Sequence, residues 1–190
     1  MARPIAKDHD AKRAAILKNA AGYFAAHGYD RASVSQVARA CGISKSLIYH
    51  YYDSKEQLLF DILHSHLTQV HDAVTAVSCH GAHPETHLRH LVADLLMTYR
   101  GADAEHRLPL QSTTALSPQQ QQDLAKIQRT IVSIFATAIQ DIAPDYLQEA
   151  PSDLRPLTMS LFGMLNWFYL WHQPGRGLSR STYGDMATDI

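Results

Sequence analysis

Apolar residues recur along the first part of the chain with the spacing of an amphipathic helix. Between residues 10 and 27, Ile16, Ala20 and Phe24 fall four positions apart, which places them on one face of a helix. Gly28 follows them, and glycine often ends helices because it adopts positive φ angles without strain. The pattern therefore predicts a helix over 10–27.

Two shorter apolar stretches follow, at 34–40 and 45–52. Ser33 and Ser44 each precede one stretch, where a serine hydroxyl can accept a hydrogen bond from the first backbone N–H groups of a helix. Gly42 lies between the two stretches. The pattern predicts two short helices joined by a tight turn, which is the arrangement of a helix-turn-helix.

The rest of the chain also shows helical spacing, so the predicted fold class is all-α. The expected helices cover 54–78, 87–100, 103–114, 118–142 and 157–172, with a closing helix from Ser179. Three prolines within 144–156 predict a loop. The helix at 157–172 is apolar almost all round, and we expect it to be buried on more than one side.

Composition agrees with a folded protein. The 190 residues are 46% hydrophobic and 18% charged, as in globular chains. The polar start ARPIAKDHDAKR does not resemble a signal peptide, and no apolar run approaches the roughly 20 residues of a membrane span. We therefore expect a cytoplasmic protein without membrane contact. Cys41 and Cys79 are expected to be packing residues.

Charge is divided unevenly along the chain. Residues 1–60 hold nine Lys and Arg against five Asp and Glu, a net +4, whereas residues 61–190 hold eight against thirteen, a net −5. A basic N-terminal segment favours a polyanion as its partner.

The stretch at 45–52 has two chemically different faces. Ile48 and Tyr52 share one side, with Tyr51 at its margin, and we expect them to pack on the two preceding helices. The other side carries groups that can bond to a phosphate or a base edge, with one apolar residue among them: Lys45, Ser46, Leu47, Tyr49 and His50. Lys55 follows in the first turn of the next helix, where we expect it to contact a phosphate. The alternative is an ordinary solvated face with satisfied tyrosines.

The run SVSQVARACGISKSLIYHYYDSKEQLL, preceded by the apolar positions of the first helix, resembles the N-terminal DNA-binding domain of TetR-family transcriptional regulators. The resemblance implies a three-helix helix-turn-helix domain over 1–55 and a helical ligand-binding and dimerisation domain over 56–190. It implies contacts to double-stranded DNA from Ser33, Ser44, Lys45, Ser46, Leu47, Tyr49, His50, Tyr51 and Lys55. Leu47 stands where the family often has threonine, so we expect apolar contact with a thymine methyl there.

The apolar helix at 157–172 is a candidate for dimerisation. Trp167 and Trp171 lie one turn apart, as do Met164 and Phe168, so opposite sides can serve the core and a two-fold partner helix. We expect a homodimer with the two tryptophans at its interface. A central core helix in a monomer is the alternative, but a single short recognition helix reads little sequence.

The segment LFGMLNWFYLWHQPGRGLS resembles the TetR-family subgroup that represses phenylacetate and related aromatic and acyl catabolism. This resemblance implies release from a palindromic operator by an acyl- or aryl-CoA effector such as phenylacetyl-CoA. Met97, Phe162 and Tyr169 are expected to take the acyl or aryl group, and Arg100, Arg107 and Arg176 the phosphates.

Histidines suggest a different kind of sensor. Seven of the twelve fall between positions 64 and 90, and His83, His87, His90 and Asp94 have a spacing that suits metal ligands on one helical face. A repressor that senses a metal or a free small molecule, with the same DNA-binding mode, is therefore the alternative. Pro84 places His83 before the helix proper, however, and we assign no metal site and no cofactor. No nucleophile elbow, carboxylate pair or nucleotide loop indicates an enzyme.

Overall fold

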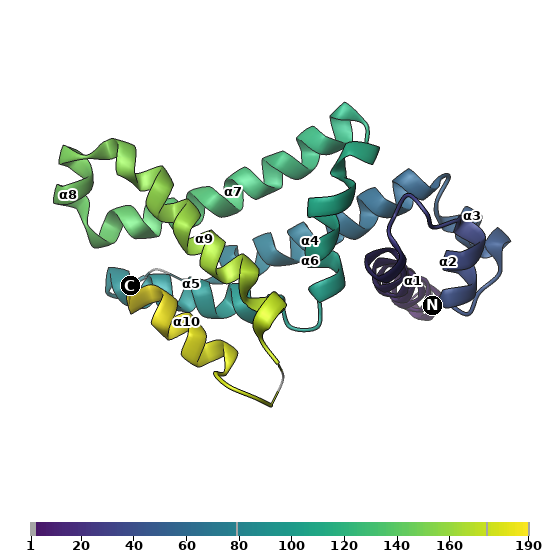
Figure 1. Ribbon diagram of the computed structural model, residues 1–190, viewed down its shortest axis with the longest axis horizontal. Helices are drawn as coiled ribbons and strands as arrows, with labels where there is room; N and C mark the ends of the chain where they lie inside the picture. The colour runs from purple at the N-terminus through teal and green to yellow at the C-terminus, as the bar shows by residue number, and fades with distance from the viewer. Residues whose placement is uncertain (1–2, 79, 174, 190) are drawn as a thin grey trace. The chain divides into compact units, whose positions relative to one another are not determined.

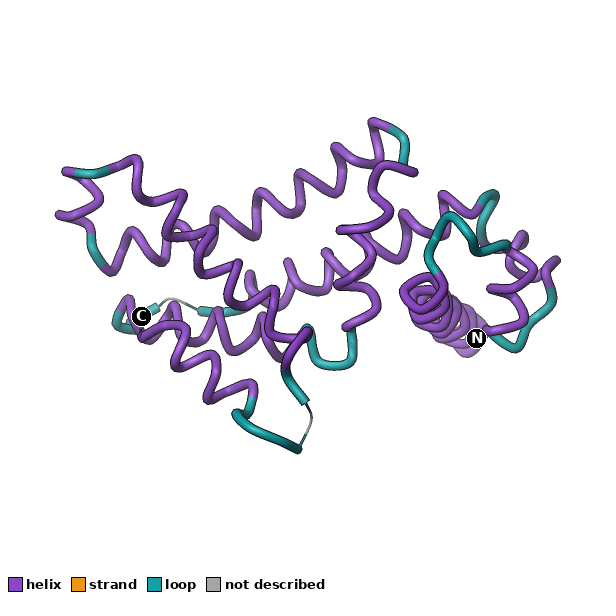
Figure 2. Tube along the Cα trace, viewed as in Figure 1, coloured by secondary structure: helices purple, strands orange, loops and turns teal. Residues whose placement is uncertain are grey.

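The computed structural model describes residues 3–78, 80–173 and 175–189, which form helices joined by short loops (Figure 1). These ranges contain no strand (Figure 2), so the predicted all-α fold class is confirmed. None of the described helices is long and apolar enough to cross a membrane. The elements are α1 (Arg3–His27), α2 (Val34–Ala40), α3 (Lys45–Tyr51), α4 (Lys55–Ala76), α5 (Pro84–Thr98), α6 (Asp103–Ser112), α7 (Pro118–Ile142), α8 (Pro144–Glu149), α9 (Leu154–Trp171) and α10 (Arg180–Asp189), with 3-10 turns η1 (Thr113–Ala115) and η2 (Pro151–Asp153).

Internal contacts divide the chain into two compact units. The first, here called the head, holds the chain up to Leu67 together with Gly101–Leu124. The second, here called the body, holds Thr68–Arg100 and the chain from Ala125 onward. The head thus includes α6 and the start of α7, which the sequence assigned to the C-terminal domain. The boundary after residue 55 stays a prediction, because it concerns which residues bind DNA and which bind an effector.

One apolar core holds the head together. Its buried residues before position 100 are Ile16, Leu17, Ala20, Ala21, Phe24, Tyr29, Ala32, Val37, Ala38, Ile48, Tyr52, Leu58, Leu59, Ile62 and Leu63. Leu108, Leu116 and Leu124 belong to the same core. Because apolar burial is the main favourable term in folding, α6 and the start of α7 are structural parts of the head.

The ends of the first helices are fixed by the residues that the sequence singled out. Gly28 ends α1 with a φ of 82°. Ser33 caps α2 through a capping box, and the Ser44 hydroxyl accepts a hydrogen bond of 3.2 Å from a backbone N–H in the first turn of α3. Gly42, with a φ of 68°, forms the turn between α2 and α3. The predicted helix-turn-helix is present at the predicted positions.

A helix lies where three prolines predicted a loop, so that prediction is wrong. α8 begins at Pro144, η2 begins at Pro151, and Pro156 is the third residue of α9. The first turn of a helix leaves its N–H groups without intrahelical partners, so proline loses nothing there, and its fixed φ suits a helix start. These prolines start helices instead of separating them.

α9 in the body is buried on one side and exposed on the other within a single chain. Its buried residues are Thr158, Leu161, Phe162, Leu165 and Phe168. Its exposed large apolar residues are Leu157, Met159, Trp167, Leu170 and Trp171. The expected burial on more than one side is therefore not reached within one chain.

α5 and α10 pack closely in the body. A Cβ atom on Gly184 would lie 3.2 Å from Cγ1 of Val92 and 3.3 Å from Cδ1 of Leu96. Arg89 donates a 3.1 Å hydrogen bond to the Thr188 hydroxyl, next to this contact along α10. The close approach of the two helices accounts for a glycine at position 184.

Candidate nucleic-acid interface

The two faces of α3 differ in burial as well as in chemistry. Ile48 and Tyr52 are only 1% and 2% exposed, which confirms that they face the core. The exposed residues are Lys45, Ser46, Tyr49 and His50, and Leu47 and Tyr51 are half-buried. α3 therefore presents a polar surface with one apolar residue at its edge.

Ser33 and Ser44, both predicted to approach DNA, already act as helix caps. In the capping box of α2, the Ser33 hydroxyl accepts a 3.3 Å hydrogen bond from the Gln36 N–H, and it also donates a 2.9 Å hydrogen bond to the Gln36 side-chain oxygen. The Ser44 hydroxyl caps α3 and lies 2.9 Å from the Ser46 hydroxyl. Any DNA contact by Ser33 or Ser44 would be additional to this role.

The aromatic residues of α3 contact one another and α1. The Tyr51 ring lies 4.8 Å from the His9 ring of α1 and 5.5 Å from the His50 ring. Lys45 Nζ lies 5.6 Å from the centre of the Tyr49 ring. The sequence did not indicate His9, because its contact with Tyr51 forms only when the fold brings α1 beside α3.

Lys55 lies in the first turn of α4, and its ammonium group makes hydrogen bonds within the protein. Lys55 Nζ donates to the carbonyl oxygens of Tyr29 and Ala32, at 3.1 and 3.2 Å. It also lies 4.2 Å from the centre of the Tyr29 ring. The predicted phosphate contact is untested by this geometry, but the carbonyl contacts were not predicted.

A series of hydrogen bonds links α1, α4 and α7 within the head. The Arg13 guanidinium donates to the Asp61 carboxylate at 2.5 Å, which raises the pKa of Arg13. Asp61 also accepts from the Gln57 amide at 3.1 Å, and Gln57 accepts from the Gln120 amide at 3.3 Å. Burial raises the pKa of Tyr52, which packs beside this series, to about 12. These contacts hold α1 and the start of α7 on α4.

The residues predicted to bind an effector lie in different environments. Phe162 is buried, with its ring 4.9 Å from the Phe135 ring. Met97 is 53% exposed and Tyr169 is half-buried. The three arginines are exposed, Arg100 and Arg176 in the body and Arg107 in the head. The effector site therefore stays a prediction.

The body contains a polar contact that the sequence analysis missed. The Tyr99 hydroxyl donates to the side-chain oxygen of Asn166 at 3.1 Å, which joins the end of α5 to α9. Burial raises the pKa of Tyr99. These two residues lie 67 positions apart, so no spacing along the chain indicates their contact.

Trp167 and Trp171, predicted at a dimer interface, are 55% and 52% exposed on α9. The Trp171 ring lies 5.0 Å from the Phe168 ring and 5.2 Å from the Tyr183 ring. Large exposed apolar patches are rare on monomeric proteins and mark interaction surfaces.

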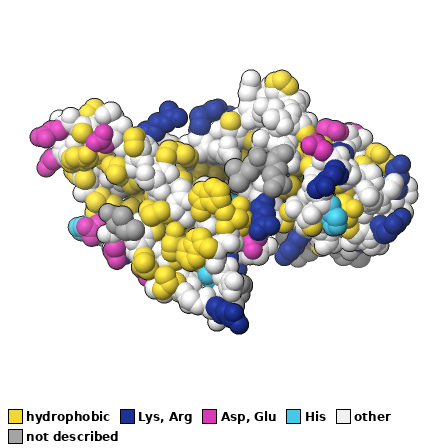
Figure 3. Space-filling view, in the orientation of Figure 1, with side chains coloured by type: hydrophobic (Ala, Val, Ile, Leu, Met, Phe, Trp, Pro, Cys, Tyr) yellow, Lys and Arg dark blue, Asp and Glu magenta, His cyan; other side chains and the backbone are white. Residues whose placement is uncertain are grey.

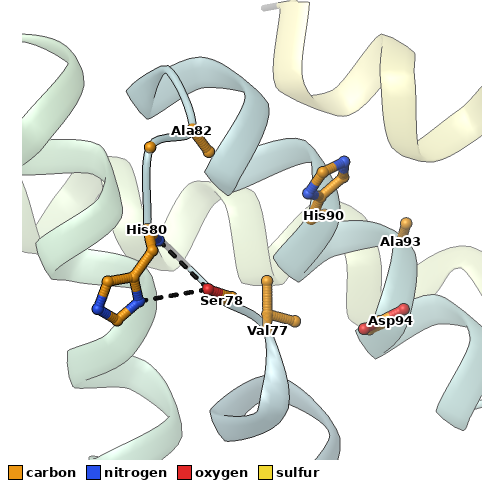
Figure 4. Close-up of a pocket in the computed structure, with 8 residues that line it drawn as sticks. Val77, Ser78, His80, Ala82, His90, Ala93 and Asp94 are labelled. Atoms are coloured by element: carbon orange, nitrogen blue, oxygen red, sulfur yellow. Dashed lines mark hydrogen bonds between the residues drawn. The ribbon is translucent and has the colours of Figure 1, made fainter.

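A pocket of about 520 Å³ lies where α4 gives way to α5, and it is lined by Val77, Ser78, His80, Gly81, Ala82, His90, Ala93 and Asp94. The His80 and His90 rings do not point toward each other across it (Figure 4). In the part of the chain that the structure describes, no three His, Cys, Asp or Glu side chains are placed to hold a metal ion. The spacing of His83, His87, His90 and Asp94 does not produce a metal site there.

A capped turn followed by a short helix with an exposed polar face, inside an all-helical head, defines the class of helix-turn-helix regulators. The sequence model for bacterial regulatory proteins of the tetR family matches residues 16–62. The model for a tetracyclin repressor-like C-terminal domain matches residues 81–190. The chain belongs to the TetR family.

Several relatives share this architecture. A TetR-family transcriptional regulator from Bordetella parapertussis 12822 is 30% identical, with a TM-score of 0.86 over 93% of this chain and 92% of that one. AibR, solved in complex with isovaleryl coenzyme A and operator DNA, is 25% identical, with a TM-score of 0.78 over 93% of this chain and 96% of AibR. The transcriptional repressor KstR2 of Rhodococcus jostii RHA1 is 31% identical over 56% of this chain and 52% of its own length. Among the curated sequence relatives, the matched part of this chain spans between 27% and 52% of the relative's length.

Proposed function

We propose that the chain is a cytoplasmic transcriptional repressor that binds double-stranded DNA through the exposed face of α3. The observation that carries this proposal is the two-sided α3, with a buried side anchored by Ile48 and Tyr52 and a polar side led by Lys45 and Tyr49. Ammonium and hydroxyl groups bind phosphates and base edges. The net +4 charge of residues 1–60 supports the same partner.

The repressor acts as a homodimer on a palindromic operator. The exposed apolar residues of α9 form an unpartnered face, and Figure 3 shows hydrophobic side chains gathered over this helix. A second copy that covers the face with its own α9 would bury both pairs of Trp167 and Trp171. Two α3 helices would then read two half-sites, which a single α3 cannot do.

The effector of the repressor is an acyl- or aryl-CoA thioester, and phenylacetyl-CoA is the proposed example. AibR, which matches most of this chain, was solved with isovaleryl coenzyme A. The thioester would bind in the body, with apolar contacts from Phe162 and Tyr169 and with phosphate contacts from exposed arginines. Binding would favour a conformation in which the two α3 helices no longer match the half-sites, which releases the DNA.

Selection from a random duplex library tests the DNA-binding proposal. The protein should enrich an inverted repeat, because a two-fold dimer presents two identical α3 helices. Enrichment of a single, asymmetric site would contradict the dimeric mode, and the absence of any enrichment would contradict DNA binding.

Calorimetry tests the effector separately, with phenylacetyl-CoA, isovaleryl-CoA, the two free acids and zinc as titrants. The thioesters should bind far more tightly than the acids, because only they carry the nucleotide phosphates that arginines can bind. Equal affinity for acid and thioester would contradict the CoA proposal. Binding of zinc alone would favour the metal-sensing alternative.

A further inference from the structure

The ammonium group of Lys55 makes three contacts with the segment between α1 and α2. Its Nζ donates to the Tyr29 carbonyl at 3.1 Å and to the Ala32 carbonyl at 3.2 Å, and it lies 4.2 Å from the centre of the Tyr29 ring. An ammonium group has three N–H donors, so these contacts use two of them and place the charge over an aromatic face. The side chain is half-buried.

The segment that Lys55 contacts is itself well packed. Tyr29 is 5% exposed, and its ring meets the Phe24 ring edge-on at 5.2 Å. The Tyr29 carbonyl also accepts a 3.1 Å hydrogen bond from the Ala32 N–H, which closes the turn. Lys55 therefore binds a turn that is already ordered at the end of α1.

This turn leads directly into the helix-turn-helix. Ala32 precedes Ser33, the cap of α2. α2 is joined in turn to the residues just before α3, because the Ile43 N–H donates to the Ala38 carbonyl at 3.0 Å. A shift at Ala32 would thus move α2, and with it the exposed face of α3.

Lys45, in the same head, has an exposed side chain that DNA can reach. Lys45 is exposed on α3, and its ammonium lies 5.6 Å from the centre of the Tyr49 ring. Lys55, in contrast, has two of its three N–H donors engaged by carbonyls of the protein, which fix the position of its ammonium group. The two lysines carry the same charge but have different surroundings.

We infer that Lys55 is a positioning residue for DNA binding, which holds the turn before α2 on the start of α4 and so sets the orientation of α2 and α3. This inference rests on the proposed DNA-binding function. It replaces a direct phosphate contact by Lys55 with an indirect role. Loss of the Lys55 ammonium should then weaken operator binding without changing the number of phosphates that the protein contacts.

The test compares Lys55→Met with the matched control Lys45→Met, using the selected operator and a scrambled duplex at several salt concentrations. Lys45→Met should reduce the slope of log affinity against log salt by about one per subunit, as expected when a cation that displaces a counterion from the DNA is lost. Lys55→Met should leave the slope unchanged but weaken operator binding by roughly tenfold, about 1.4 kcal/mol, with little effect on scrambled duplex. Lys55→Arg, which keeps the charge and the donors, should restore most of the operator affinity.

Thermal unfolding of the free protein supplies a readout without DNA. Lys55→Met should lower the melting temperature, because it removes the ammonium donor from the Ala32 carbonyl and one of two donors from the Tyr29 carbonyl, whereas Lys45→Met should not. Amide exchange in α2 should also become faster in Lys55→Met alone.

Three results would overturn the inference. A salt slope that Lys55→Met reduces as much as Lys45→Met does would show a direct phosphate contact. Unchanged operator affinity in Lys55→Met would show that the turn does not position α3. Unchanged melting temperature and α2 exchange would show that Lys55 does not hold the turn. If the unmodified protein binds no duplex at all, the proposed function fails, and the last of these measurements still decides whether Lys55 holds the turn.

Discussion

His66 is a buried histidine on α4 whose proton equilibrium is coupled to folding. Burial, with a smaller contribution from His106, lowers the pKa of His66 from 6.5 to about 4. The two rings are 6.0 Å apart. The unfolded chain binds this proton near pH 6.5 and the folded chain only near pH 4. The contribution of His66 to the free energy of unfolding should therefore be fully present above about pH 6.5. It should be lost as the pH falls toward 4, which lowers the free energy of unfolding by up to about 3 kcal/mol.

Urea unfolding at pH 7 and pH 5 checks this prediction. The unmodified protein should lose stability between the two values, and His66→Gln, which cannot titrate, should lose less. His27→Gln, on exposed α1 surface, serves as the control. An identical pH dependence in the unmodified protein and in His66→Gln would contradict the prediction.

Leu47 is the one α3 residue whose expected contact is with a base and is apolar. Leu47→Ala should relax discrimination at one base pair in each half-site, at a cost of about 1 to 3 kcal/mol for the preferred base. Titrations on operators that vary at single positions would locate that base pair. Equal weakening on all duplexes would show that Leu47 supports α3 without reading sequence.

For single residues, the sequence predicts which side chains are buried better than it predicts the residues that they contact. The alternation of Ile48 and Tyr52 with polar neighbours identified the buried side of α3, because helical spacing alone decides it. The carbonyls that Lys55 binds lie more than twenty residues before it. No local pattern indicates a contact at that separation.

Two helical glycines, one in α1 and one in α10, differ in how much space surrounds them. Gly22 in α1 has nothing within 4 Å of an added Cβ, whereas Gly184 would press on Val92 and Leu96. Gly22→Ala should stabilise the protein by about 0.5 to 1 kcal/mol through helix propensity. Gly184→Ala should instead destabilise it by about 1 kcal/mol, because overpacking outweighs the same gain.

Equilibrium unfolding of the two variants measures the difference directly. Both substitutions add the same methyl group to a helix, so they differ only in what surrounds it. Equal stabilisation by the two would show that α5 and α10 separate at little cost.

Element boundaries followed from local chemistry where a cap or a glycine fixes them. Ser33, Gly42 and Ser44 each act within a few residues, so the sequence located α2 and α3. α8 was missed because proline has two readings, as a breaker inside a helix and as a favourable first residue. Only the path of the chain after Ile142 shows which reading holds at Pro144.

For the whole molecule, the central prediction is a dimer built on α9. Trp167→Asp should give a folded monomer, because it would place a charge in the proposed contact between copies while the residue is 55% exposed in a single chain. Met186→Asp, also at an exposed apolar position but on α10, should leave the dimer intact.

Sedimentation at micromolar concentration, with circular dichroism to confirm folding, would decide this. If the unmodified protein sediments as a monomer, the proposed architecture is wrong. If Met186→Asp also dissociates the dimer, the interface extends beyond α9.

The effector site lies at the limit of what the sequence predicts. Resemblance supplied residue types for it, but one of the arginines lies in the head and Met97 lies on the surface. Binding sites depend on the convergence of residues from several elements, and periodicity within one element carries no information about that convergence.

The core of the head comes from two separate stretches of the chain. The first stretch therefore cannot finish packing until the second has been synthesised. When Leu67 is added to the growing chain, Leu108, Leu116 and Leu124 have not yet been made, although they belong to the same core. At roughly 5 to 20 residues per second, translation needs about 3 to 11 further seconds to reach Leu124. The nascent helix-turn-helix exposes part of its apolar surface during that time. The same topology limits the exchange of DNA-binding segments between relatives, because a cut after residue 55 leaves these three leucines behind with the rest of the chain.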